Sequence, residues 1–154
     1  MKTILLPIRL SSNTLSLLRC AERMCSEMEA SLLFLYIVPK QNYDNGTFAP
    51  NTEVHQRVVQ EAKVILEQLS RKAITNGIRS RIVVMDGSPA DTILQVARQA
   101  RASMVILEKT AWLHDEVAER LIKQATCPVL SWNEQTDAEA LPSSSRVPQQ
   151  LAVA

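Results

Sequence analysis

The segment Asp86-Gly87-Ser88-Pro89-Ala90-Asp91 constrains the fold most, because it joins a strand to a helix. The apolar run Ile82–Met85 before it is typical of a strand, and Asp86-Gly87 breaks that run. Ser88 can then accept a hydrogen bond from an N–H of the first helical turn, and Pro89 fits the first helical position, where no N–H is needed. Asp91 lies at the positive end of the helix dipole. The segment therefore predicts a strand, a tight turn and a helix.

Two further strands extend this unit toward the C-terminus. The run Met104–Leu107 is apolar without alternation, which is typical of a strand buried on both faces. A helix over about Glu116–Ala125 and a strand over Pro128–Trp132 follow it, with Asp115 as the expected helix cap. Strands and helices in this succession favour a parallel sheet with right-handed crossovers.

The first half of the chain shows the same alternation of strands and helices. The elements expected there are strands over Thr3–Leu10, Ser31–Val38 and Ile78–Met85, a helix that starts within Ser11–Thr14 and ends near Met28, and a helix over about Thr52–Asn76 with an apolar stripe from Val54 to Ala73. Five strands and four helices predict a doubly wound α/β sheet with helices on both faces, formed by residues 1–133. Residues 134–154 show no sustained periodicity and are predicted to form a flexible C-terminal tail.

Charge and cysteine content exclude several classes of function. The formal net charge is +1 and the basic residues are scattered, so neither nucleic acid nor a membrane is an expected partner. The first residues, Met1–Arg9, are too short and too interrupted for a signal peptide, which makes the cytoplasm the expected location. An odd number of cysteines (Cys20, Cys25 and Cys127) predicts buried thiols rather than a disulfide framework.

No enzyme motif or metal-binding motif emerges from the polar residues. Asp86 and Asp91 flank Gly87 and could form a carboxylate pair, but a role for Asp91 in the first helical turn is the simpler interpretation. Ser88 does not lie in a nucleophile elbow, and His114 has neither a nucleophile nor an orienting partner nearby in the sequence. The histidines lie in unrelated segments without ligand spacing. We therefore predict neither catalytic residues nor a metal site.

The chain resembles the universal stress protein family over about Lys2–Trp132. The resemblance is carried by Ile4-Leu5-Leu6-Pro7-Ile8, Gly87-Ser88-Pro89-Ala90, Ala102-Ser103-Met104-Val105-Ile106, Val117-Ala118-Glu119-Arg120-Leu121 and Cys127-Pro128-Val129-Leu130. It implies a fold like that of the adenine-nucleotide α-hydrolases, with strand order 3-2-1-4-5. It also implies a dimer, often formed through the fifth strand. One branch of the family binds ATP and the other does not.

Two departures from the family pattern argue against ATP as a cofactor. Arg9 stands at the end of the first strand, where the ATP-binding branch has an acidic residue. That branch also carries Gly-x2-Gly-x9-Gly-Ser/Thr after the fourth strand, whose N–H groups surround the phosphates. Here no glycine lies between Leu107 and Glu116, and the connection is too short for the motif. We expect a divergent member that does not bind ATP.

The site itself has two interpretations. Arg9, Lys109 and Thr110 could form an altered site for a nucleotide or another anion, with Gly87 and His114 as further candidates. In the other interpretation these are solvated loop residues. Trp112 and Leu113 either cover the crevice that would otherwise hold a nucleotide, or belong to a surface for a partner protein.

The fifth strand suggests how the protein would associate. Val129, Leu130 and Trp132 are expected at an open sheet edge, where pairing with a second copy gives a homodimer. Alternatively, the tail folds back over this edge. The leading hypothesis is a non-enzymatic homodimer that acts in the stress response through contacts with unknown proteins. The alternative is a nucleotide- or anion-responsive binding module.

Overall fold

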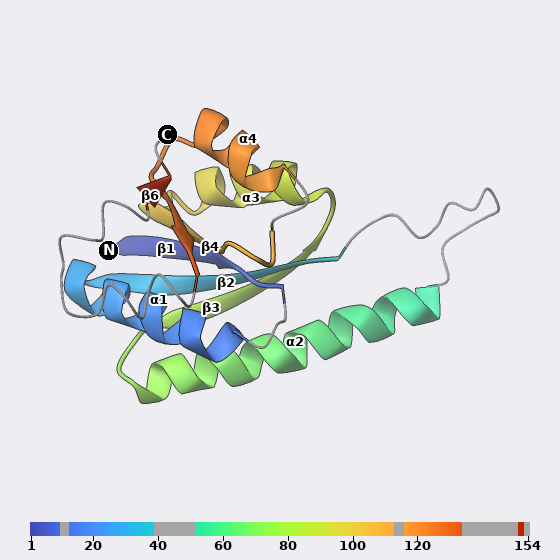
Figure 1. Cartoon of the computed structure of the whole chain (residues 1–154). Coiled ribbons are helices and arrows are strands. Elements are labelled where there is room, and N and C mark those ends of the chain that lie inside the picture. Colours follow the sequence, from blue (N-terminus) through green and yellow to red (C-terminus); the bar gives the residue numbers. More distant parts are fainter. Residues whose placement is uncertain (10–12, 39–51, 113–115, 134–150, 153–154) are drawn as a thin grey trace.

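The computed structural model describes residues 1–9, 13–38, 52–112, 116–133 and 151–152, which form one twisted sheet between two layers of helices (Figure 1). The strands are β1 (Lys2–Pro7), β2 (Ala30–Val38), β3 (Ser80–Asp86), β4 (Met104–Glu108), β5 (Val129–Trp132) and β6 (Leu151–Ala152). The helices are α1 (Thr14–Met28), α2 (Thr52–Thr75), α3 (Pro89–Gln99) and α4 (Val117–Gln124). The sheet order is β3-β2-β1-β4-β5-β6, and β1 to β5 are parallel. The predicted fold class and the order 3-2-1-4-5 are confirmed.

The central strands are apolar at nearly every position because both faces of the sheet are covered. Successive residues of a strand point to opposite faces. Ile4 and Leu6 therefore pack with α1 and α2, whereas Leu5 packs with α3 and α4 (Figure 1). Each helix layer thus has its own hydrophobic core, and the two cores share the same strands.

The start of α3 differs from the prediction in one respect. Pro89 occupies the first helical turn and Asp91 is its acidic residue, as expected. The Ser88 hydroxyl does not cap a backbone N–H; it donates to Asp91 Oδ2 at 2.9 Å. An ionised carboxylate is a strong acceptor, and its proximity turns the hydroxyl toward it.

Gly87 is required by both backbone and space. Its φ of +148° lies in a region that side-chain-bearing residues rarely adopt, and an added Cβ would lie 2.5 Å from Thr92 Oγ1. Its N–H donates to the Val38 carbonyl oxygen at 3.2 Å, which ties the turn after β3 to the end of β2. The residue therefore has a structural role at this turn.

Part of the C-terminal segment, which was predicted to be a flexible tail or to fold back over the sheet edge, is described as a strand. Residues 134–150 and 153–154 lie outside the described part of the chain, but Leu151–Ala152 forms β6, antiparallel to Val129 and Leu130. The edge expected to be open is therefore covered over these two residues. The unpaired N–H and C=O groups of an edge strand favour such pairing.

The three cysteines are free and buried, as predicted. Burial raises the pKa of the Cys25 thiol to about 12, with a smaller contribution from the charge of Glu22. Met24 and Met28 pack against the same core on the α1 side of the sheet. Together with Cys20 and Cys25 they fill space between α1 and the strands, whereas Cys127 lies in the core with α3 and α4.

Candidate functional site

The structure brings three of the predicted site residues to one place. Arg9 follows β1, and Lys109 and Thr110 follow β4; β1 and β4 are the neighbours at which the strand order reverses. The crevice outside such a reversal is the usual ligand site of open α/β sheets. Gly87 follows β3, which β2 and β1 separate from β4, so it does not join this group. His114, like Leu113 and Asp115, lies outside the described residues.

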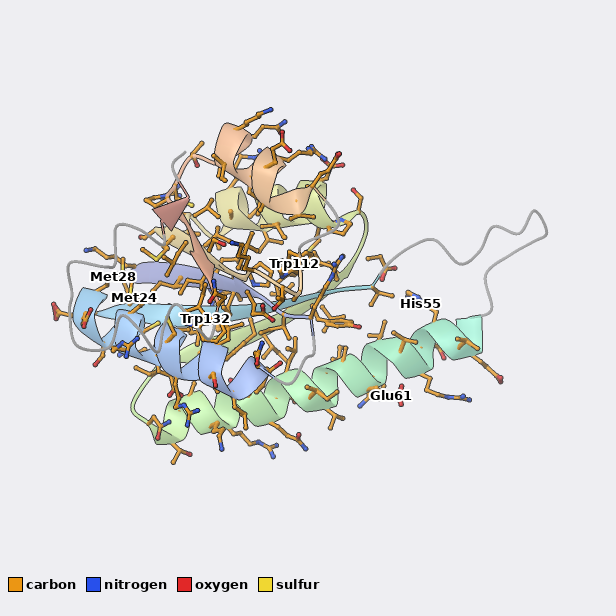
Figure 2. The ribbon with its side chains drawn as sticks, in the orientation of Figure 1. Met24, Met28, His55, Glu61, Trp112 and Trp132 are labelled. Carbon is orange, nitrogen blue, oxygen red and sulfur yellow. The ribbon has the colours of Figure 1, made fainter. Side chains whose placement is uncertain are left out.

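Arg9 and Trp112 form a stacked pair at this crevice. The Arg9 Cζ lies 3.9 Å from the centroid of the Trp112 ring, and Arg9 Nη1 donates to the Ala111 carbonyl oxygen at 3.0 Å. Trp112 is 3% exposed and packs in the core on the α3 and α4 side (Figure 2). This position agrees with the interpretation that Trp112 covers the crevice. The guanidinium that the altered-site interpretation assigned to an anion is held against protein.

The Glu108 carboxylate accepts hydrogen bonds from backbone N–H groups of the turn that follows β4. The Glu108 side chain is 2% exposed, and its Oε2 accepts the N–H groups of Thr110 at 2.6 Å and Ala111 at 3.3 Å. The same oxygen accepts the Thr110 hydroxyl. The intervening Lys109 N–H donates to the Trp132 carbonyl oxygen at 2.6 Å. Three consecutive N–H groups of the turn are therefore bonded within the chain.

A cavity of about 300 Å³ lies between this turn and the start of α4. Its lining residues are Leu107, Lys109, Trp112, Glu116, Ala118, Glu119 and Ser131. In the described part of the chain the buried indole N–H of Trp112 has no hydrogen-bond partner. Glu116 precedes α4 at a φ of +55° and its side chain makes no capping bond. The described lining residues supply one ammonium and two carboxylates, and this charge does not favour an anion.

The two aspartates near Gly87 do not form a carboxylate pair, because each contacts a basic side chain from another element. Asp86 lies 3.3 Å from His55 Nε2, which α2 supplies (Figure 2). Asp91 accepts from Arg120 Nη2 at 2.7 Å. The hydrogen bond from Arg120 holds the pKa of the Asp91 carboxyl below its usual value of 3.8, with smaller contributions from the Ser88 hydroxyl and the charge of Arg120.

No cluster of three or more histidines, cysteines and acidic residues suited to a metal ion occurs among the described residues. Within the same ranges, none of the helices is both long and apolar enough to cross a membrane.

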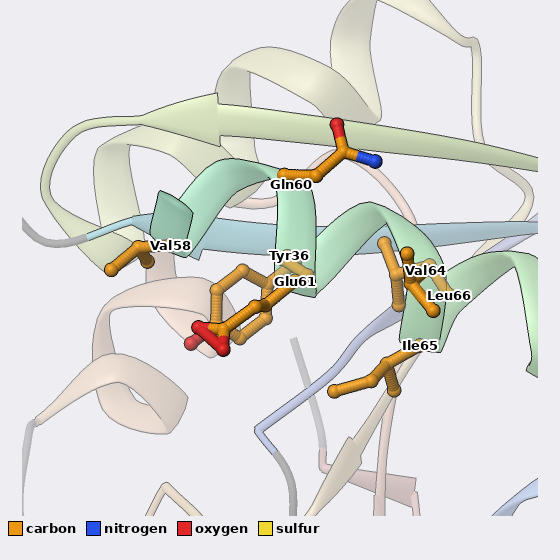
Figure 3. Close-up of a pocket in the computed structure, with 8 residues that line it drawn as sticks. Tyr36, Val58, Gln60, Glu61, Val64, Ile65 and Leu66 are labelled. Carbon is orange, nitrogen blue, oxygen red and sulfur yellow. The ribbon is translucent and has the colours of Figure 1, made fainter. Parts of the chain in front are cut away.

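A second, larger cavity of about 460 Å³ lies along α2 and went unpredicted (Figure 3). Its lining residues are Tyr36, Val58, Gln60, Glu61, Ala62, Val64, Ile65 and Leu66. The spacing of Val58, Ala62 and Ile65 was the available signal, but on a helix this spacing indicates contact with a core. The cavity is mainly apolar, and its polar groups come from Tyr36, Gln60 and Glu61.

The predicted interface residues of β5 face inward rather than outward. Val129, Leu130 and Trp132 are at most 1% exposed, and they pack in the two cores of this protein. The side chains of a strand point at the layers above and below the sheet, so only backbone groups lie at its edge. A contact between β5 and a second copy would use the backbone, with half-buried Ser131 beside it.

The fold and the crevice define a class of protein. It is an α/β protein with a doubly wound sheet, and at the strand-order reversal the backbone N–H groups of the turn after β4 are bonded within the chain. A family model described as "Universal stress protein family" matches residues 1–131, and the chain belongs to this family. Universal stress protein MJ0531 of Methanocaldococcus jannaschii is 25% identical over 136 residues, covering 84% of this chain and 80% of that protein.

Solved structures show the same fold at lower identity. Universal stress protein UspA of Lactobacillus plantarum has a TM-score of 0.74 at 20% identity, over 84% of this chain and 96% of that one. The universal stress protein of Archaeoglobus fulgidus in complex with dAMP has a TM-score of 0.63 at 17% identity, over 84% and 95%. At these identities the likeness concerns the fold alone.

Proposed function

We propose that this universal stress protein does not bind ATP in its crevice and acts through contacts with other proteins, as a homodimer formed at β5. One observation carries the proposal. The N–H groups of Thr110 and Ala111 donate to the Glu108 carboxylate, and the Lys109 N–H donates to the Trp132 carbonyl oxygen. These are the groups that a phosphate would need at the turn after β4. The protein is then neither an enzyme nor dependent on a cofactor.

The negative charge of Glu108 also argues against a phosphate at this turn. A phosphate placed on these N–H groups would displace the carboxylate of Glu108 or lie beside it. Two unit charges of the same sign 4 Å apart repel by about 4 kcal/mol at an effective dielectric constant near 20. Arg9 offers little compensation, since its guanidinium is stacked on Trp112 and donates to Ala111.

A nucleotide- or anion-responsive module is the second candidate. The Archaeoglobus fulgidus relative was solved in complex with dAMP, so the fold accommodates a nucleotide in that protein. Here the cavity of about 300 Å³ offers Lys109 and the indole N–H of Trp112, which has no hydrogen-bond partner among the described residues. Of Arg9, Lys109 and Thr110, only Lys109 lines this cavity, because the other two are engaged within the protein.

Thermal unfolding in the presence of MgATP, AMP, dAMP or inorganic phosphate separates the two candidates. We expect no change in the Tm of the parent with any of the four. A ligand at 100 times its Kd would add about 2.7 kcal/mol, a rise in Tm of about 5–11 °C for a domain of this size.

A rise that Lys109→Ala abolishes, and that the exposed-lysine control Lys72→Ala retains, would establish the second candidate. ATP binding that survives Lys109→Ala would contradict both.

A further inference from the structure

The cavity of about 460 Å³ along α2 lies on the face of the sheet opposite to the Trp112 core. Tyr36 of β2 and Ile65 of α2, which line it, pack against the core with α1 and α2, and Leu66 belongs to that core. Trp112 lies in the core with α3 and α4. The cavity is therefore distinct from the crevice at the strand-order reversal, and the crevice does not account for it.

The cavity exists because α2 places a small side chain toward the sheet. Val58, Ala62 and Ile65 follow one another at spacings of four and three, so they share one face of the helix. Ala62 lines the cavity at 6% exposure, and its methyl group fills little of the volume beside its larger neighbours. Protein interiors are otherwise close-packed. The apolar side chains along this face, with the buried Leu66, therefore present carbon atoms to a space that a ligand can fill.

The polar groups that line this cavity favour a positive charge. They are the Tyr36 hydroxyl, the Gln60 amide and the Glu61 carboxylate, and Glu61 supplies the one charge among the described lining residues. Its side chain makes no ion pair or hydrogen bond with another described residue. Arg57 and Lys63, the cations nearest to Glu61 along α2, do not belong to the described lining. An apolar cavity with an acidic group at its border is suited to an amphipathic cation.

We propose that this cavity binds a small organic cation, which consists of an apolar body and an ammonium group. The apolar body lies against Ala62, Ile65 and Leu66, and the ammonium group pairs with the Glu61 carboxylate. Tyr36 contributes aromatic surface, to which cations are attracted. The volume falls within the range of about 300–1,000 Å³ that is usual for small-ligand pockets. The site goes beyond the proposed function and is independent of it.

Three probes that share one apolar body test the chemical class of the ligand. Phenylbutylamine, phenylbutanol and phenylbutyrate carry a cationic, a neutral and an anionic group at neutral pH. Calorimetric titration of the full-length chain should give the lowest Kd for the amine, a Kd about two- to fivefold higher for the alcohol, and the highest for the carboxylate. The methyl NMR signals of Ile65 and Leu66 should shift on binding. A Kd for the alcohol or the carboxylate that equals or falls below that of the amine would overturn the assignment of a cation.

Glu61→Gln tests the role of the carboxylate. It should raise the Kd of phenylbutylamine about two- to fivefold and leave that of phenylbutanol unchanged. Glu67→Gln removes an exposed acid of α2 outside the described lining, and it should keep both parent values. An amine Kd that is the same in the parent and in Glu61→Gln would show that Glu61 does not hold the ammonium group. Glu61 is exposed, so its replacement does not threaten the fold.

Val58→Phe tests the location of the site. The larger side chain fills part of the cavity and should abolish the binding of all three probes, whereas Val54→Phe, at an exposed position of α2 outside the described lining, should retain it. Far-UV circular dichroism checks that both variants are folded. Unchanged binding to a folded Val58→Phe would place the probes elsewhere. Absence of binding and of methyl shifts with all three probes would refute the site, while leaving the proposal on ATP untouched.

Discussion

Arg9 is the residue whose contacts in the structure differ most from the role that the sequence suggests. A cation at the end of β1 is a natural candidate for holding an anion, yet its planar group lies on Trp112 and one N–H is bonded to Ala111. A guanidinium is suited to such stacking because it is planar and weakly hydrated. The charge that suggested a ligand site therefore stabilises the turn after β4.

This interpretation predicts a measurable coupling between Arg9 and Trp112. Arg9→Met keeps the aliphatic stem and should lower the free energy of unfolding by about 1–2 kcal/mol, through the lost cation–π contact and hydrogen bond. Trp112→Ala should cost about 3–5 kcal/mol, because it leaves a cavity in the core. With Trp112→Ala already present, Arg9→Met should cost about 0.5–1 kcal/mol less than in the parent.

Urea unfolding of the parent, both single variants and the double variant gives this coupling. Arg19→Met, on the exposed side of α1, is the control and should change the stability little. Strictly additive costs for Arg9→Met and Trp112→Ala would show that the stack stabilises nothing.

At the scale of elements, α3 and α4 are joined by a charged contact at the surface. Asp91 in the first turn of α3 accepts from Arg120 of α4 at 2.7 Å and from Ser88 at 2.9 Å. The Arg120 hydrogen bond is the largest cause of the lowered pKa of Asp91. The carboxylate in the first turn of α3 therefore also contacts α4.

The contact predicts a defined pH dependence. Because the pKa of Asp91 is lower in the folded than in the unfolded protein, its stabilising contribution is complete above 3.8 and is lost as the pH falls through the folded value. Asp91→Asn should therefore be less stable than the parent at neutral pH, and the difference should shrink toward acid pH. Urea unfolding across this range measures it.

The partner of Asp91 can be checked separately. Arg120→Gln should raise the pKa of Asp91 toward 3.8 in an NMR titration of its carboxyl carbon. Lys123→Gln removes a cation of α4 that pairs with Glu119 instead, and it should leave the Asp91 titration unchanged. An Asp91 pKa that is the same in the parent and in Arg120→Gln would contradict the assigned cause.

The sequence predicts elements well where one local rule decides the outcome. The residues of β1 and β4 are apolar because helices cover both faces of the sheet. Pro89 begins α3, where its missing N–H costs no hydrogen bond. The spacing of apolar residues along a helix does not show how far the sheet beneath that helix extends. Val54 belongs to the apolar stripe of α2 but is 49% exposed, because that end of the helix extends beyond the sheet (Figure 1).

The site was only partly predictable, since its contacts join segments distant in sequence. The missing glycines after β4 are visible in the sequence, but the burial of Glu108 depends on how the turn folds back over its carboxylate. The stack of Arg9 on Trp112 joins the ends of two strands far apart in the chain. A strand of two residues, such as β6, is too short for any periodicity.

At the scale of the whole molecule, one sheet separates two hydrophobic cores that each contain one tryptophan. Trp132 lies in the core with α1 and α2, and Trp112 in the core with α3 and α4 (Figure 2). β1 supplies Ile4 and Leu6 to the first core and Leu5 to the second. Neither core can lose its packing without exposing the strands that the other needs.

We therefore expect the two layers to unfold in a single transition. Trp132→Phe leaves Trp112 as the only tryptophan, so its fluorescence follows the α3 and α4 layer; Trp112→Phe leaves Trp132, which follows the other. In each variant, urea transitions followed by tryptophan fluorescence and by far-UV circular dichroism should coincide. The comparison is made within each variant, since replacing a buried tryptophan shifts the midpoint itself. Fluorescence that changes before circular dichroism in one variant alone would mean that its layer unfolds first, and that the shared strands do not couple the cores.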